Sequence, residues 1–240
     1  AHSLSELRIV WPMSRAALMV AVKEIVRRNH VRDGLVYLQV TRGVAPRDHP
    51  FPAHSESALV ITARKSGPMD KDALRTGVNV ITIPDIRWQR CDIKSVALLP
   101  NVLGKQQARD ANAFEAWQVD DEGYVTEGTS TNAWIVTADG DLVTRNASTS
   151  ILNGVTRLSV LEAAAKADID IMERPFTPKE ALAAREAFIT SSTSHVKAVT
   201  RIDGQSIGNG HVGELTNRVL DAYVEYMETH GGPRTTDTWN

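Results

Sequence analysis

"DIRWQRCDIKSVALLPN", residues 85–101, places one lysine, Lys94, in a stretch that otherwise has the composition of a buried strand. The apolar residues around it are Ile86, Trp88, Ile93, Val96, Leu98 and Leu99. Burying a charged amine without a partner is costly, so a surface lysine with its amine in water is the common case. A desolvated lysine, however, loses its proton easily and can form an imine with a carbonyl group. The stretch therefore leaves two interpretations of Lys94, a solvated side chain or a reactive amine.

Composition describes an ordinary globular chain and excludes several partners. The 240 residues carry a formal net charge of −2, and a pI near 6.4 argues against nucleic acid or an anionic membrane surface. No apolar run reaches membrane-spanning length. The single cysteine cannot form an internal disulfide, which fits a reducing, cytoplasmic location. No metal site is expected, because His49 and His54 have no carboxylate or cysteine at metal-ligand spacing.

Helical and strand patterns mix along the chain without strict alternation, which favours an α+β fold over a doubly wound sheet. Helices are expected at 14–29, 101–113, 154–167, 212–229 and from 177 onward. Strands are expected at 33–43, 57–65, 78–83, 86–93, 115–119, 123–126, 133–137, 142–144, 168–173 and 186–190. A polar, Gly- and Pro-rich segment at 66–77 suggests a boundary. The predicted organisation is a small N-terminal domain (1–68), a linker (69–73), a large domain (74–232) and a tail (233–240).

One candidate site residue is the carboxylate of "TEGTSTN", residues 126–132. Glu127 follows a short predicted strand and precedes three hydroxyl side chains. A carboxylate fixed in this way can face a protonated ring nitrogen. The alternative is a polar hairpin turn, as most such strings are.

Two other segments suit an anion. In "ILNGVTR" (151–157) a helix begins at Gly154, so the amides of Val155 and Thr156 have no partner within the helix. Every helix shares such an end, so this signal alone is modest. "TSSTSH" (190–195) follows a strand and either lines a second side of a phosphate or forms an ordinary serine-rich loop.

Taken together and in this order, these segments resemble the fold-type IV pyridoxal-phosphate enzymes, most closely the bacterial D-amino acid aminotransferases. The residues that carry the resemblance are "GLVYLQVTRGVAPRDHPFP", "DIRWQRCDIKSVALLPNVLGKQQA", "VTEGTSTNAW", "ILNGVTR" and "FITSSTS". Each string is a weak signal alone, but they cover nearly the whole chain in the family's order. The resemblance implies a two-domain enzyme whose large domain binds pyridoxal 5'-phosphate.

The resemblance also implies roles for particular residues. Lys94 would hold the cofactor as an internal aldimine, Glu127 would face the pyridine nitrogen, and Leu152 would pack on the ring. The residues around the cofactor phosphate would be Gly154, Val155, Thr156, Ser191 and Ser192. An Arg-x-His loop that captures the substrate carboxylate in the D-amino acid branch matches Arg47 and His49. Because that loop reaches the neighbouring subunit's site in the family, a homodimer is implied.

The chain departs from the family at its amino end. There the family has a segment with an arginine that binds the phosphate and a tyrosine that lines the pocket, and neither has a counterpart here. We therefore expect part of the N-terminal lobe to be lacking. The implied reaction moves an amino group from a D-amino acid, such as D-alanine, to a 2-oxo acid, such as 2-oxoglutarate. Branched-chain L-amino acid transaminase, R-amine transaminase, aminodeoxychorismate lyase and an inactive cofactor-binding fragment stay open as alternatives.

Overall fold

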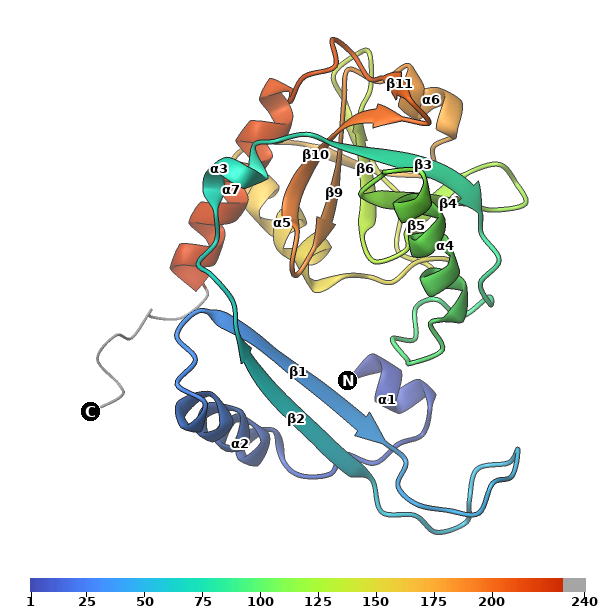
Figure 1. The fold of residues 1–240 in the computed structure, drawn as a ribbon, viewed down its shortest axis with the longest axis vertical. Coiled ribbons are helices and arrows are strands. Elements are labelled where there is room, and N and C mark those ends of the chain that lie inside the picture. Colours follow the sequence, from blue (N-terminus) through green and yellow to red (C-terminus); the bar gives the residue numbers. More distant parts are fainter. Residues whose placement is uncertain (231–240) are drawn as a thin grey trace. The chain divides into compact units, whose positions relative to one another are not determined.

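The computed structural model describes residues 1–230 and divides into two compact units, the first formed by residues 1–70 and the second beginning at Lys71 (Figure 1). The predicted tail (233–240) lies outside the described residues. Within 1–230, no helix has the length and apolar character needed to cross a bilayer. In the same residues, no three His, Cys, Asp or Glu side chains gather as metal ligands do.

The first unit is an antiparallel pair of strands with a helix packed against it. β1 (Gly34–Thr41) pairs with β2 (Ala58–Lys65) along its whole length. α2 (Arg15–Arg28) contacts β2, and it begins where the Ser14 hydroxyl accepts the Ala17 amide at 3.2 Å. A short helix, α1 (His2–Glu6), precedes it. The predicted helix and both predicted strands of this unit are confirmed.

The loop between β1 and β2 carries Arg47 and His49. Residues 42–57 contain no helix or strand, as the prolines of this segment predict. Gly43 opens the loop with φ +105°, and a Cβ there would lie 1.9 Å from the carbonyl oxygen of Glu56. Only glycine fits that position. Both Arg47 and His49 are exposed on this loop.

The second unit is built on one mixed sheet whose strand order is β5-β4-β3-β10-β9-β6-β7-β8, with β11 paired to β10. Its strands are β3 (Val78–Pro84), β4 (Glu115–Val119), β5 (Val125–Gly128), β6 (Asn132–Val136), β7 (Leu142–Thr144), β8 (Ile171–Glu173), β9 (Glu186–Ser191), β10 (His195–Ile202) and β11 (Gln205–Ser206). Its helices are α3 (Lys71–Leu74), α4 (Leu99–Asp110), α5 (Val155–Lys166), α6 (Pro178–Leu182) and α7 (Glu214–His230). β3 runs parallel to β4 and β10, whereas β9 runs antiparallel to β6 and β10. The predicted α+β class is confirmed.

Two aromatic pairs lie in the core of this unit. Trp117 of β4 meets Phe176 edge to face with ring centroids 6.0 Å apart, and Trp134 of β6 stacks on Phe188 of β9 at 5.3 Å. All four side chains are fully buried, and each such burial contributes on the order of 2–3 kcal/mol. α5 and α7 pack on each other and on β9. This packed core therefore holds in place the strands whose ends carry the candidate site residues.

Several elements of the second unit differ from the sequence prediction. Residues 86–93 are not a strand, because the Asp85 side chain accepts the Arg87 amide at 3.1 Å and turns the chain at the end of β3. β10 is not among the predicted strands, although it lies in the middle of the sheet. Its buried residues Val196, Ala198 and Val199 are interrupted by polar ones, and the serine-rich segment before it suggested a loop. The short helices α1 and α3 were also not predicted.

Candidate active site

Glu127, near the end of β5, has a buried carboxylate that three groups hold in place. The Arg87 guanidinium donates to its Oε1 at 2.5 Å, and the Asn132 side-chain amide donates to its Oε2 at 3.0 Å. The backbone amide of Leu152 lies 3.1 Å from each carboxylate oxygen. Glu127 is only 5% exposed, so these donors take the place of water around it.

The electrostatics of this carboxylate depend on burial and on Arg87. Burial raises the pKa of Glu127 to about 7, while Arg87 and the Leu152 amide act in the opposite direction. Arg87 also forms a two-point ion pair with Asp85. The Arg87 Nε donates to the Asp85 Oδ1 at 2.9 Å, and the Arg87 Nη2 donates to the Asp85 Oδ2 at 2.7 Å. Burial alone would raise the pKa of Asp85, but Arg87 holds it below its ordinary value. One buried cation thus lies between two carboxylates, and Glu127 can exchange a proton near neutral pH.

The loop that carries Lys94 is tied to the chain segment just before Leu152. The Cys91 amide donates to the Thr149 carbonyl at 2.8 Å, and Arg87 donates to the Ser150 carbonyl at 3.1 Å. Lys94 follows three residues after Cys91. The loop of Lys94 and the carboxylate of Glu127 are therefore anchored to the same short stretch of backbone.

Lys94 itself lies in an exposed part of this loop, as the first of the two interpretations, a solvated side chain, expects. Its apolar neighbours Val96, Leu98 and Leu99 are 70%, 50% and 68% exposed. Apolar composition resembles a buried strand only when a neighbouring strand and a core are present to cover it. After the turn at Asp85 this segment is not paired to a strand. Ile93 is still buried, at 7% exposed, but the apolar residues that follow Lys94 are not covered by the core.

The start of α5 is joined to the same cluster through Asn132. The Asn132 side chain, besides its bond to Glu127, donates to the Leu152 carbonyl at 2.9 Å. A Cβ on Gly154 would lie 2.5 Å from the Asn132 Oδ1, so glycine is needed for this close approach. Gly154 is the N-cap of α5 and has no side chain to bond the first-turn amides of Val155 and Thr156.

Ser191 and Ser192 lie where β9 ends. Thr190, the residue before them, is the register partner of Asn132 across β6 and β9. The Ser191 hydroxyl accepts the Ser194 amide at 3.0 Å, and Ser192 is exposed. The sheet therefore sets these serines on the strand next to Asn132.

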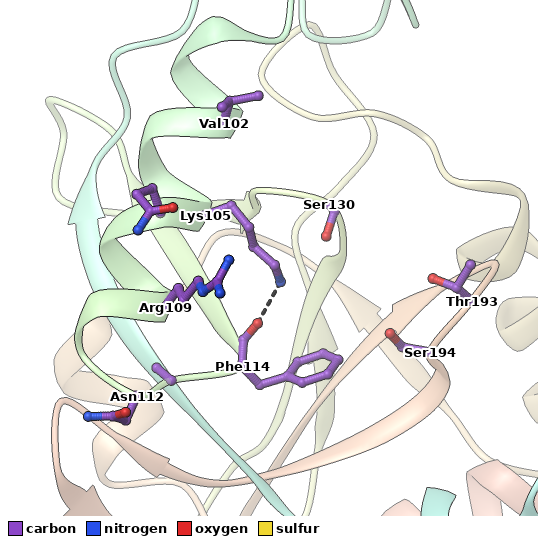
Figure 2. A pocket seen from close by; sticks show the side chains of 10 residues that line it. Val102, Lys105, Arg109, Asn112, Phe114, Ser130, Thr193 and Ser194 are labelled. Carbon is purple, nitrogen blue, oxygen red and sulfur yellow. Dashed lines mark hydrogen bonds between the residues drawn. The ribbon is translucent and has the colours of Figure 1, made fainter.

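A second buried carboxylate, Glu115, fixes the turn that follows Glu127. It accepts hydrogen bonds from the Ser130 amide at 3.2 Å and the Ser130 hydroxyl at 2.8 Å, and its own exposure is 0%. Lys105 of α4 lies 3.4 Å from it and donates to the Phe114 carbonyl at 2.5 Å. Figure 2 shows Lys105, Phe114 and Ser130 around a hollow that Thr193 and Ser194 also line.

Comparison with known protein families decides the assignment. Residues 1–202 match the family described as amino-transferase class IV. The chain belongs to the class IV aminotransferases. This confirms the family and the enzyme class predicted from the sequence.

Individual relatives agree with the class IV assignment. A D-alanine aminotransferase of Bacillus licheniformis is 44% identical over 220 residues, which are 92% of this chain and 77% of the relative. One of Staphylococcus haemolyticus is 37% identical over 95% of this chain and 80% of its own length. Among solved structures, a T.th. branched-chain amino acid aminotransferase with pyridoxamine 5'-phosphate has a TM-score of 0.83 at 29% identity, covering 93% of this chain and 75% of that one. The Escherichia coli branched-chain enzyme shares the fold, with a TM-score of 0.85 at 23% identity over 100% of this chain and 79% of its own.

Within this class IV fold, the predicted site residues are only partly brought together. Glu127 and Leu152 are in contact, and Gly154 approaches Asn132 beside them. Three residues were not predicted, namely Arg87, Asn132 and Glu115. Arg87 lies two residues after Asp85, in the segment that contains Lys94. That spacing, which allows an ion pair between the two, was the only signal for Arg87 in the sequence. Arg47 and His49 belong to the first unit, and their role in the class IV site stays a prediction.

Proposed function

We propose that this chain is a pyridoxal 5'-phosphate-dependent transaminase that moves an amino group from a D-amino acid, such as D-alanine, to a 2-oxo acid, such as 2-oxoglutarate. The observation that carries the proposal is the buried Glu127, which Arg87 and Asn132 hold beside the uncapped start of α5. The relatives named D-alanine aminotransferases, at 37% to 44% identity, support the D-amino acid assignment. The single cysteine supports a cytoplasmic location.

The residues present fit the proposed cofactor at both of its ends. A phosphate needs hydrogen-bond donors, and the first-turn amides of α5 with the hydroxyls of Thr156, Ser191 and Ser192 supply them. Thr156 is 5% exposed, so its hydroxyl is held in a fixed environment. A ring nitrogen that carries a proton needs a carboxylate, and Glu127 supplies one with a pKa raised to about 7.

The bound cofactor supplies an aldehyde that condenses with amines and a protonated ring that takes up electrons from the substrate's α-carbon. Glu127 would keep the proton on the ring nitrogen, and Arg87 favours the ionised form of Glu127 and orients its carboxylate. Asn132 fixes the same carboxylate from its other oxygen. Leu152 contributes its amide to Glu127 and its side chain to the face of the ring.

Lys94 is the residue proposed to hold the cofactor covalently and to carry the proton. Its amine, once displaced by the substrate's amine, would move a proton between the substrate's α-carbon and the C4′ carbon of the cofactor. The loop anchors at Cys91 and Arg87 support this role, because they tie Lys94 to the backbone next to Leu152.

Arg47 and His49 are proposed to bind the substrate carboxylate, for which the arginine offers a planar pair of donors. We further propose a homodimer in which this loop serves the site of the partner subunit. The exposure of both residues leaves them accessible for this contact.

Branched-chain L-amino acid transaminase is the second candidate, because solved structures with TM-scores of 0.83 and 0.85 carry that name. Their identities of 29% and 23% are lower than the 37% to 44% of the D-alanine aminotransferases. The sequence relatives therefore favour the D-amino acid activity.

The test combines cofactor binding with substrate choice. Adding pyridoxal 5'-phosphate is expected to give a visible absorbance band, and borohydride reduction should fix the added mass on the peptide that contains Lys94. Lys94→Ala should abolish this covalent adduct. Lys65 is an exposed lysine of β2, and Lys65→Ala should retain the adduct. D-alanine should then bleach the band and L-leucine should not. Labelling of another lysine, or bleaching by L-leucine alone, would contradict the proposal.

A further inference from the structure

Tyr223 of α7 is a buried tyrosine whose hydroxyl meets two different parts of the second unit. It is 3% exposed, and its hydroxyl lies 3.3 Å from the Nδ1 of His195. The two rings lie 5.9 Å apart, centroid to centroid. Burial raises the pKa of Tyr223, whereas a hydrogen bond between the same hydroxyl and the Thr156 side chain acts in the opposite direction. A buried phenol needs a polar partner, and this one has two.

The two partners come from the two segments assigned to the cofactor phosphate. Thr156 is in the first turn of α5. His195 opens β10 and is the register partner of Ser191, so it closes the turn that contains Ser191 and Ser192. α7 packs against both α5 and β10, which gives the tyrosine a rigid base.

We propose that Tyr223 and His195 are positioning residues for the cofactor phosphate, in that the Tyr223 hydroxyl holds the start of α5 and the turn after β9 at a fixed separation. The inference rests on the proposed function, because it assumes that a phosphate lies between these segments. It goes beyond that function in assigning a role to two residues that do not themselves contact the cofactor.

The chemistry of a phosphate sets the direction of the hydrogen bonds. A phosphate dianion accepts only, so Thr156 must turn its hydroxyl hydrogen toward it. Without a phosphate, Thr156 donates to the phenol oxygen, as its lowering of the Tyr223 pKa indicates. With a phosphate bound, this bond would reverse, so that the Thr156 oxygen accepts from the Tyr223 hydroxyl and the Tyr223 oxygen accepts from the Nδ1–H of His195. Each bond in such a chain strengthens the next, which makes the Thr156 hydroxyl a better donor.

A purely structural role makes a different prediction from a positioning role. If Tyr223 and His195 only filled the core, removing the Tyr223 hydroxyl would lower stability and would weaken the binding of pyridoxal and of pyridoxal 5'-phosphate equally. If the pair orders the phosphate ligands, the loss should fall on the phosphorylated form alone. The ratio of the dissociation constants of pyridoxal and pyridoxal 5'-phosphate separates the two roles.

The experiment titrates wild type and variants with both compounds and follows protein fluorescence. Tyr223→Phe keeps the ring and is expected to lower the ratio by about five-fold, the effect of one net hydrogen bond, with pyridoxal affinity unchanged. Tyr226→Phe is the matched control on the same helix, because the Tyr226 hydroxyl bonds the exposed Glu162 at 2.6 Å. It should leave the ratio unchanged.

His195→Asn gives a second variant that does not depend on the folding of Tyr223→Phe. His195 has φ +53°, which asparagine tolerates better than most residues. His195→Asn should also lower the ratio of the dissociation constants of pyridoxal and pyridoxal 5'-phosphate. An unchanged ratio in both variants, or equal weakening of both compounds, overturns the inference alone. A wild type that does not prefer the phosphorylated compound overturns the proposed function and this inference together.

Discussion

The Arg87 guanidinium lies 2.5 Å from the Glu127 carboxylate, and both side chains are less than 10% exposed. A buried ion pair of this kind is costly to form and more costly to break, because either partner left alone is an uncompensated charge. Here the cation is shared with Asp85, so its charge is balanced on two sides. This arrangement sets the proton affinity of the carboxylate proposed to face the cofactor ring.

Replacing Arg87 tests that setting directly. Arg87 lowers the pKa of Glu127, so in Arg87→Gln this pKa should rise above its value of about 7. The acid limb of the pH profile for amino-group transfer from D-alanine should then move to higher pH, and stability should fall by about 3 kcal/mol. Arg90→Gln, which breaks a more exposed pair with Asp92, is the control and should move neither. A folded Arg87→Gln with an unshifted acid limb would show that Arg87 does not govern Glu127.

The raised pKa of Glu127 also predicts how the cofactor-free protein responds to pH. The group titrates near 4.5 when unfolded and near 7 when folded, so between these values the folded state holds its proton more tightly. Its contribution to stability is complete below pH 4.5 and is lost as pH rises through 7. Each unit of such a shift corresponds to about 1.4 kcal/mol.

Glu127→Gln should therefore gain in melting temperature relative to wild type as pH rises from about 5 to about 8. Glu122→Gln, at an exposed turn position, should follow wild type across the range. A constant difference between Glu127→Gln and wild type would mean that the folded and unfolded pKa values are equal.

Much of the scaffold could be predicted from the sequence, because local patterns determine it. Ser14, for example, caps α2 as its sequence position suggests, and Thr177 accepts the Glu180 amide at the start of α6. Glu127 could be proposed as a site residue from the sequence because a carboxylate after a strand is a local signal. The ion pair with Arg87 was not, since 40 residues separate the partners and only the sheet brings them together. The strand wrongly predicted at 86–93 has the same origin, because an apolar pattern does not show whether a neighbouring strand exists.

Gly154→Ala tests the close approach between α5 and Asn132. The added Cβ would lie 2.5 Å from the Asn132 Oδ1, so Asn132 must shift and its bonds to Glu127 and Leu152 must weaken. A loss of about 1–3 kcal/mol in stability is expected, together with weaker binding of pyridoxal 5'-phosphate. Gly67→Ala, where nothing lies within 4 Å of the new Cβ, should stay within about 0.5 kcal/mol of wild type. Equal stability of the two variants would rule out this packing constraint.

Arg47→Ala separates recognition of the substrate from binding of the cofactor. Arg47 lies on the exposed loop after β1, within the first unit, whereas the residues proposed to bind the cofactor all belong to the second. Loss of its guanidinium removes the paired donors for the substrate carboxylate, worth about 2 kcal/mol or more for a charged hydrogen bond. We expect D-alanine turnover to fall at least about thirty-fold through a higher KM, with an unchanged absorbance band for bound pyridoxal 5'-phosphate. Arg64→Ala on β2 provides an exposed arginine of the same unit as the control. If Arg47→Ala and Arg64→Ala turn over D-alanine equally well, the substrate carboxylate is bound elsewhere and the D-amino acid assignment loses its main residue.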